Sequence, residues 1–304
     1  MGSKMVKYAT IAITNKCNSR CTMCNIWKTG ITPTEINAEQ FGDLFKQDYF
    51  KDIIDASISG GEPVLRKDAI DVVKSIIDNL PALKHLWVNS NGTYPKRVLA
   101  LLESVYGKIE NEYLCLSIEG RPEDMHKVRG INCYDSVIQT AKLIREQLPK
   151  INVVFSTTIT PHNSNIANLE HVAELASKYG CTYTFRFANN NDDFYHNSDV
   201  NLCIPEEDVT TIMDFSRKFK ADDKFIAAQH NFFKTGQIDI MDNCLAGSEF
   251  VFVRPDGTMT PCINSGRVIS KPMVIKDLGT KEKCPCCTEC CFYPMLSHKQ
   301  SKQK

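Results

Sequence analysis

Three cysteines near the N-terminus have the spacing of ligands that hold one inorganic group. Cys17, Cys21 and Cys24 lie in the segment CNSRCTMC, directly after an apolar run at residues 8–14. A cubane iron–sulfur cluster needs four ligands, so three thiolates would hold it and leave one iron open to a further molecule. Structural zinc is the alternative, but it takes four ligands in paired CxxC spacing, and here CxxxC precedes CxxC with no histidine nearby. We therefore predict a cluster with one open iron.

The other cysteines also favour metal or cluster binding. Of the 14 cysteines in the chain, seven fall between Cys244 and Cys291, and the four outside both groups are scattered. Disulfides are not expected, because the start of the chain has no apolar signal segment, and residues 2–4 before Met5 resemble an expression tag. We expect a reducing compartment and predict a cytoplasmic protein.

Composition argues against two classes of partner. The 304 residues include 36 Lys and Arg against 36 Asp and Glu, for a formal net charge of +0. A chain without excess positive charge gives no electrostatic sign of nucleic-acid binding. The sequence contains no apolar run near the ~20 residues that a membrane-spanning helix needs. We therefore expect neither nucleic acid nor a membrane as a partner.

Strand-like and helix-like segments alternate along the first two thirds of the chain. Strands are expected at residues 8–14, 52–59, 85–89, 112–118, 151–158 and 182–187, and helices at 37–49, 67–80, 96–106, 134–147 and 165–179. This alternation indicates a parallel sheet covered by helices. Six strands are fewer than the eight of a closed TIM barrel. The predicted fold class is α/β, a partial (β/α)6 TIM barrel with a small C-terminal cysteine-rich hairpin/helix extension.

Four unusual loops each follow a predicted strand. They are the cysteine loop and the segments Gly60-Gly61-Glu62-Pro63, Asn89-Ser90-Asn91-Gly92 and Glu119-Gly120. In parallel α/β sheets the functional residues lie at the C-terminal ends of the strands, so we expect one site there. We divide the chain into a barrel core (5–187), a linker or helical segment (188–243), a cysteine-rich unit (244–291) and a tail (292–304).

The segment CNSRCTMC resembles the CxxxCxxC motif of the radical SAM superfamily. Three further segments resemble motifs of that family in the same order: SGGEP at 59–63, NSNG at 89–92, and LSIEG at 116–120 with HKVRG at 126–130. The last pair resembles the SxDG and HDxxRG motifs of the SPASM/twitch branch. Glu119 stands where Asp is usual and Lys127 replaces the second acidic residue, so this pair does not indicate a substrate.

The resemblance implies a function for these motifs. Cys17, Cys21 and Cys24 would bind a [4Fe–4S] cluster whose electron cleaves S-adenosylmethionine to methionine and a 5′-deoxyadenosyl radical, which abstracts hydrogen from a C–H bond. An external electron donor such as flavodoxin or ferredoxin would be a partner. Glycines let a backbone approach a small ligand, although a tight turn alone is the alternative at Gly60 and Gly61. The implied cofactor-binding residues are Met23, Gly60, Gly61, Glu62, Asn89, Ser117, Glu119, Arg129 and Ser156.

A second cysteine group resembles the twitch form of the SPASM/twitch signature. Cys244 and Cys262 flank a hairpin expected around Asp256-Gly257 at residues 250–260, because the strand pattern alternates about an Asp-Gly turn. With Cys284 and Cys287 they would bind one auxiliary [4Fe–4S] cluster, because the compressed run at 284–291 breaks the spacing for two. The pair Cys287 with Cys290, and structural zinc in place of the cluster, remain alternatives.

Two substrate classes fit this chemistry. The first is a small polar molecule such as a sugar or aminocyclitol, acted on by a radical SAM oxidoreductase or epimerase, with Arg186 and Cys203 as predicted catalytic residues. The second is a ribosomally made peptide matured by epimerisation or crosslinking. We favour the first, because the chain starts directly at its first strand, without the N-terminal peptide-recognition domain of many peptide-modifying relatives. An iron–sulfur protein without enzymatic activity is disfavoured by the Gly60-Gly61 loop beside an incomplete cluster.

Overall fold

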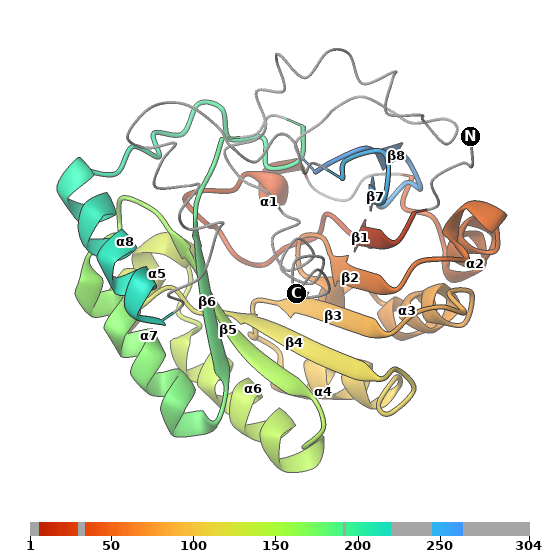
Figure 1. Ribbon diagram of the computed structural model, residues 1–304, viewed down its shortest axis with the longest axis horizontal. Coiled ribbons are helices and arrows are strands. Elements are labelled where there is room, and N and C mark those ends of the chain that lie inside the picture. Colours follow the sequence, from red (N-terminus) through yellow and green to blue (C-terminus); the bar gives the residue numbers. More distant parts are fainter. Residues whose placement is uncertain (1–5, 30–33, 191–192, 220–244, 264–304) are drawn as a thin grey trace, which may run out of the picture.

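The computed structural model describes residues 6–29, 34–190, 193–219 and 245–263. These residues form one sheet with the strand order β6-β5-β4-β3-β2-β1-β7-β8 (Figure 1). The strands are β1 (Tyr8–Ala12), β2 (Asp55–Ser59), β3 (His85–Ser90), β4 (Asn111–Ser117), β5 (Asn152–Ile159), β6 (Thr182–Phe187), β7 (Phe250–Val253) and β8 (Met259–Thr260).

The first six strands pair in parallel, each with its neighbour in the sequence. In the described residues β6 and β8 end the sheet and do not pair with each other, so the barrel is open. This confirms the predicted α/β fold, a partial barrel built from six strand–helix units. Parallel neighbours all present their C-terminal ends at the same edge, so the loops predicted to carry the site lie together.

Helices cover one face of the sheet (Figure 1). Several of them begin or end at sequence signals. Asn37 and Gln40 form a capping box at the start of α2, and Gly180, with φ +64°, ends α7. The helices are α1 (Ile26–Thr29), α2 (Ala38–Phe45), α3 (Ala69–Ile77), α4 (Pro95–Glu103), α5 (Pro122–Arg129), α6 (Tyr134–Gln147), α7 (Ile166–Tyr179) and α8 (Glu206–Phe219), with 3₁₀ turns at Asp48–Phe50 and Pro63–Leu65.

Side chains alternate between the two faces of the sheet, as strand geometry requires. In β3, Leu86, Val88 and Ser90 are buried, and the residues between them are half-buried. Leu86 and Val88 belong to the main apolar core, which also includes the buried faces of α3, α4 and α6. The opposite face of the strands is left to line the barrel interior, and there the residues near the C-terminal ends are largely polar.

The predicted hairpin around Asp256-Gly257 is confirmed, since β7 pairs antiparallel with β8. In addition, β7 pairs parallel with β1, which aligns Ile11 with Val253 and extends the core sheet beyond its six expected strands. All residues of β7 are buried, and Phe250 and Phe252 pack in a cluster with Tyr8 and Phe194. An apolar run without alternation needs cover on both faces, and here Val251 and Val253 pack in the main core while Phe250 and Phe252 pack in the second cluster.

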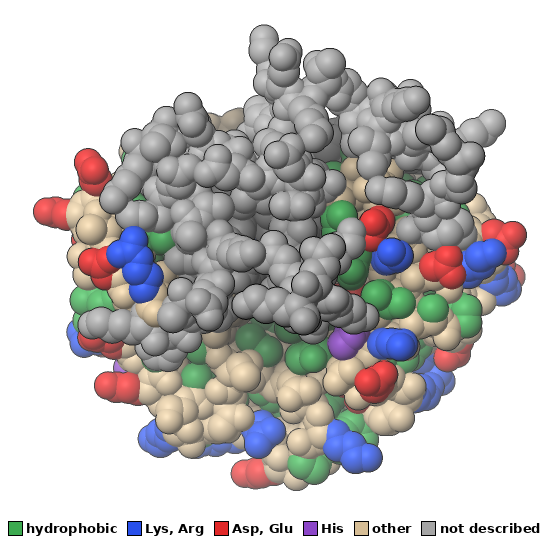
Figure 2. Space-filling model, viewed as in Figure 1, with side chains coloured by type: hydrophobic (Ala, Val, Ile, Leu, Met, Phe, Trp, Pro, Cys, Tyr) green, Lys and Arg blue, Asp and Glu red, His purple; other side chains and the backbone are tan. Residues whose placement is uncertain are grey.

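Two further findings concern the described surface and helices. None of the helices in the described part of the chain is long and apolar enough to cross a membrane. On the face shown in Figure 2, described Lys and Arg side chains are interspersed with Asp and Glu.

Candidate active site

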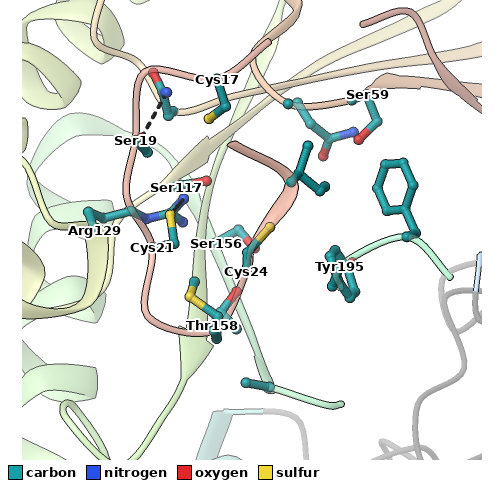
Figure 3. A pocket seen from close by; sticks show the side chains of 18 of the residues that line it. Cys17, Ser19, Cys21, Cys24, Ser59, Ser117, Arg129, Ser156, Thr158 and Tyr195 are labelled. Carbon is teal, nitrogen blue, oxygen red and sulfur yellow. Dashed lines mark hydrogen bonds between the residues drawn. The ribbon is translucent and has the colours of Figure 1, made fainter. Parts of the chain in front are cut away.

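One pocket opens at the C-terminal ends of the strands, where the sequence predicted a site. Cys17, Cys21 and Cys24 line it from the loop after β1, and Figure 3 shows them around a common space. The pocket encloses about 1090 Å³ not filled by protein atoms, part of it open to solvent. The lining combines apolar side chains with several polar groups, as in sites that bind small molecules and cofactors.

The Gly60-Gly61 segment holds one side of the cysteine loop. The backbone N–H of Gly61 donates to Thr14 O at 2.7 Å, and that of Glu62 donates to Lys16 O at 2.7 Å. A Cβ on Gly60 would lie 2.3 Å from Thr14 O, and one on Gly61 would lie 2.3 Å from Lys16 O. Both glycines also line the pocket. Their first physical role is therefore the close packing of two backbones, which places the residues just before Cys17.

The end of α5 holds the other side of the cysteine loop. The backbone N–H of Arg20 donates to Arg129 O at 2.8 Å, and that of Thr22 donates to Val128 O at 2.9 Å. A Cβ on Gly130, which has φ +66°, would lie 2.6 Å from Arg20 O. The loop between the first and last cysteines is thus held at its middle by backbone contacts that require a glycine. Helix α5 was not expected from the sequence, although Pro122 at its first turn and Gly130 at its end are signals for it.

Glu62 is buried beneath the pocket and ties three loops together. Its carboxylate accepts from Ser90 Oγ at 2.9 Å and from the backbone N–H of Asn91 at 2.6 Å. Asn91 Nδ2 in turn donates to Ser19 Oγ at 3.0 Å, the contact dashed in Figure 3, and to Asn18 Oδ1 at 2.8 Å. Burial raises the pKa of Glu62 to about 7. Glu62 therefore positions the cysteine loop through Asn91, whereas the sequence analysis had assigned it to the cofactor directly.

A loop after β6 forms another wall of the pocket. The side chain of Asn197 is fully buried and donates to Met23 O at 2.7 Å and to Asn189 O at 2.9 Å. The backbone N–H of Asn25 donates to Tyr195 O at 2.8 Å. Tyr195 lines the pocket and in Figure 3 lies across it from Arg129. Its contacts with Met23 and Asn25 make this polar segment a wall of the pocket.

The floor of the pocket is the polar inner face of β3 to β6. Strand register explains the set, because Asn89 aligns with Cys115, Ser117 with Ser156, and Thr158 with Arg186. Asn89 Nδ2 donates to Ser57 Oγ at 2.8 Å. Residues on neighbouring parallel strands in register share a face, so these side chains point to the same interior. All six aligned residues line the pocket: Asn89, Cys115, Ser117, Ser156, Thr158 and Arg186.

Glu119 and Arg129 form a buried ion pair beside Cys21. Arg129 Nη2 donates to Glu119 Oε1, and Arg129 Nη1 lies 3.6 Å from Cys21 Sγ. The pKa of Arg129 is raised, because the Glu119 carboxylate outweighs the cost of burying the guanidinium, so Arg129 stays charged. The Glu119 carboxylate is fully buried. Its contact is with Arg129, whereas the sequence analysis had expected contact with the cofactor.

The donor set fits an iron–sulfur cluster. Burial raises the pKa of Cys17 to about 11 and that of Cys24 to about 12, so binding a cationic group there would displace protons from both. No three metal-binding side chains in the described residues are spaced for a single ion. A cubane cluster is larger, and each cysteine binds its own iron. Arg129 Nε is buried without a hydrogen-bond partner in the described residues, a donor that an anionic group bound in the pocket would satisfy.

The structure brings most of the predicted site residues together. Glu62 and Glu119 lie behind the pocket wall, as described above. Cys203 is exposed and absent from the pocket lining, so its placement does not support a catalytic role. Cys262 is buried next to Ile263, which lines the pocket, while Cys244, Cys284 and Cys287 lie outside the described residues. The predicted residues that line the pocket are Cys17, Cys21, Met23, Cys24, Gly60, Gly61, Asn89, Ser117, Arg129, Ser156 and Arg186.

An open parallel α/β barrel with a CxxxCxxC loop at its pocket defines a class of protein, the radical SAM enzymes. Residues 11–176 match the sequence model of the radical SAM superfamily. The match covers more than half of the 304 residues, and the chain belongs to this superfamily.

Curated relatives share the barrel region of the chain. A GTP 3′,8-cyclase of Haemophilus influenzae (strain PittEE) is 30% identical over 139 residues, which cover 43% of this chain and 39% of the relative. The GTP 3′,8-cyclase of Sulfurimonas denitrificans is 28% identical over 191 residues, covering 60% of this chain and 56% of the relative. The chain thus spans roughly half the length of these relatives or less.

Solved structures share the fold at low sequence identity. SuiB from Streptococcus suis, bound to S-adenosylmethionine, has a TM-score of 0.65 at 14% identity, with 86% of this chain and 61% of SuiB covered. Native anSMEcpe with bound AdoMet has a TM-score of 0.57 at 17% identity, with 85% and 74% covered. At these identities the likeness concerns the fold alone.

Proposed function

We propose that Cys17, Cys21 and Cys24 bind a [4Fe–4S] cluster and that the same pocket binds S-adenosylmethionine. The observation that supports this most directly is that the three thiols line one pocket together with the polar inner face of the barrel. When bound, the two cofactors would supply a 5′-deoxyadenosyl radical that abstracts hydrogen from the substrate. The chain itself contributes binding, orientation and exclusion of water.

Residues around the pocket divide into groups suited to these tasks. Met23, on the cysteine loop, is buried and offers an apolar contact beside the cluster. Ser117 and Ser156 offer hydroxyl groups from neighbouring strands, which suits the polar parts of S-adenosylmethionine. Phe194 and Tyr195 give the pocket an apolar side wall that keeps water from the reacting carbon.

For the substrate we propose a small polar molecule with hydroxyl groups. Thr158, Arg186 and Asn189 line the pocket together and offer a hydroxyl, a guanidinium and an amide. Convergent polar groups in a largely apolar pocket are how proteins orient such molecules. The reaction would be a dehydrogenation or an epimerisation. Relatives named GTP 3′,8-cyclase match part of this chain. Cyclisation of a nucleotide is therefore a further reaction to test when candidate substrates are screened.

Maturation of a ribosomally made peptide is the second candidate. It is supported by the fold likeness to SuiB, which has also been solved with its precursor peptide SuiA, with a TM-score of 0.66 over 86% of this chain. The part of the pocket open to solvent would admit an extended chain end. Isotope content separates the reactions, since an epimerase places one solvent deuterium in its product and a dehydrogenase places none.

Cys115, rather than the predicted catalytic residue Cys203, is the proposed hydrogen-atom donor of an epimerase. Besides the three loop cysteines, it is the cysteine of the described residues that lines the pocket, and burial raises its pKa, which keeps the thiol protonated. In the step, the S–H bond breaks and a C–H bond forms at the substrate radical. The thiyl radical left on sulfur is returned to the thiol by an electron from the external donor and a proton from solvent.

We further propose a twitch-type auxiliary [4Fe–4S] cluster at Cys244, Cys262, Cys284 and Cys287. Support comes from the hairpin β7–β8, which carries Cys262 to the pocket edge beside Ile263. An external flavodoxin or ferredoxin would reduce the clusters, in a cytoplasmic setting that keeps the thiolates available.

The test begins with anaerobic reconstitution of the full chain. We expect about eight irons per chain, that is two cubane clusters, and release of 5′-deoxyadenosine when S-adenosylmethionine and a reductant are added. The variant with Cys17, Cys21 and Cys24 changed to Ala should lose this release. Cys203→Ala, which changes an exposed thiol outside the pocket lining, is the matched control and should keep it. Cleavage of S-adenosylmethionine by the triple variant would show that these three cysteines are not the cluster ligands. An iron content of about four per chain, with zinc present, would contradict the auxiliary cluster.

A further inference from the structure

Arg129 makes a contact that its proposed role in cofactor binding does not explain. Its guanidinium Nη1 lies 3.6 Å from the sulfur of Cys21. Arg129 is 8% exposed and Cys21 is 9% exposed, so solvent does not screen this contact. A buried cationic donor that faces a cysteine sulfur interacts with whatever charge that sulfur carries.

The guanidinium is held in place from several directions. Glu119 Oε1 accepts from Arg129 Nη2, while Glu119 Oε2 accepts from the backbone N–H of Thr158 at 2.6 Å. The backbone carbonyl of Glu119 accepts from Asn163 Nδ2 at 2.8 Å, which fixes the residue at both its ends. The backbone of Arg129 is also bonded to the cysteine loop at Arg20. The N–H to sulfur contact is therefore a fixed part of the site.

We propose that Arg129 is a positioning residue that raises the reduction potential of the cluster bound by Cys21, and that Glu119 sets how large the rise is. This rests on the proposed function, in that Cys21 must bind a cluster. Reduction adds one electron to the cluster and increases the negative charge on its cysteine sulfurs. A cationic N–H donor stabilises that extra charge, and hydrogen bonds to sulfur are among the factors that set cluster potentials.

Glu119 acts in the opposite direction to Arg129. Its carboxylate contacts the guanidinium and offsets part of the positive charge that the cluster experiences. Both charges lie in a buried region, where interactions are several times stronger than in water. Loss of the cation should therefore lower the potential, while neutralising the carboxylate should raise it. If the Glu119–Arg129 ion pair served structure alone, the two substitutions would not shift the reduction potential in opposite directions.

The experiment compares cluster potentials in full-length reconstituted variants. The chain is titrated anaerobically with a reductant and followed by electron paramagnetic resonance. The loop cluster is identified as the signal that disappears when Cys17, Cys21 and Cys24 are changed to Ala. The variants are Arg129→Gln, Arg129→Lys and Glu119→Gln. Lys127→Gln is the matched control, because it removes an exposed cation from the same helix whose partner is Asp124.

The proposal predicts the direction and the size of each shift in reduction potential. At the wild-type midpoint, Arg129→Gln should lower the ratio of reduced to oxidised cluster about tenfold, which is ~59 mV for one electron. Glu119→Gln should raise that ratio, and Arg129→Lys, which keeps the charge without the planar fork, should fall between wild type and Arg129→Gln. Lys127→Gln should leave the ratio unchanged, since exposed charges are screened.

Two outcomes overturn the proposal. Equal potentials in all variants, or shifts of the same sign for Arg129→Gln and Glu119→Gln, would show that the pair serves structure alone. If Arg129→Gln fails to hold a cluster, Arg129→Lys and Glu119→Gln still show in which direction these charges shift the reduction potential. A wild-type chain without any loop cluster would overturn the proposed function as well, whereas a wild-type cluster with unshifted variants overturns this inference only.

Discussion

Gly61→Ala should misplace the cysteine loop while the barrel stays folded. A Cβ at this position would lie 2.3 Å from Lys16 O and 2.7 Å from Asn15 O. Ordinary contact begins at 3.4 Å, so the backbone before Cys17 must retreat by about 1 Å. Overpacking of this kind costs ~1–3 kcal/mol, which is a minor part of the ~5–15 kcal/mol that stabilises a domain.

The functional cost should be much larger than the cost in stability. Misplacement of catalytic groups by 1 Å can lower rates by roughly 10²-fold. We expect 5′-deoxyadenosine release to fall by about that factor, with less iron bound per chain. Gly107→Ala is the matched control, because Gly107 has φ +74° but nothing within 4 Å of its Cβ position. Gly107→Ala should lose only ~1–2 kcal/mol of folding stability, the cost of a left-handed backbone for a residue with a Cβ.

The assay measures iron content, 5′-deoxyadenosine release and the thermal unfolding midpoint of both variants. We expect a large loss of 5′-deoxyadenosine release in Gly61→Ala and a small loss of stability in both variants. Wild-type release and iron content in Gly61→Ala would refute it, because the cysteine loop would then tolerate the displacement. Equal losses of release in the two variants would attribute the effect to general destabilisation.

Three further predictions follow from buried groups. Burial raises the pKa of Asp55 to about 7, so the unfolded chain releases this proton first and stability should fall between about pH 4 and pH 7 by on the order of 4 kcal/mol. Urea unfolding at several pH values should show this fall in wild type and a flatter profile in Asp55→Asn. Asn197→Ala leaves Met23 O without its donor and should cost ~1–3 kcal/mol; a raised KM for S-adenosylmethionine would accompany it, and an unchanged KM would exclude the wall role. Cys115→Ser should abolish solvent deuterium incorporation by an epimerase while 5′-deoxyadenosine release persists, and retained incorporation would exclude Cys115 as donor.

Much of the barrel could be predicted because its strands and helices have strong local patterns. The segments expected at 134–147 and 182–187 are found at Tyr134–Gln147 and Thr182–Phe187. The alternation of strands and helices also predicts parallel pairing, because short βα connections leave few other arrangements. The pairing of β7 with β1 has no such local signal, since Ile11 and Val253 meet only through the folded sheet.

The roles of the acidic site residues could not be predicted in the same way. Glu62 and Glu119 lie in motifs beside a pocket, so the sequence favours contact with a ligand for both. Whether a carboxylate faces the pocket or a neighbouring loop depends on burial and partners, and here Asn91 and Arg129 are those partners. The placement of Cys203 likewise depended on the path of the chain after β6, which local patterns do not specify.

The three-cysteine loop shows where sequence and tertiary structure divide. The sequence by itself predicted the ligand chemistry, because residue type and spacing decide which atoms a short loop can turn toward one cluster. It also determined that the loop follows a strand. Tertiary structure alone decided what holds the loop and what faces its sulfurs. Gly61, Asn91 and Arg129 come from three other parts of the chain, and their contacts exist only once the parallel sheet has brought its loops to one edge.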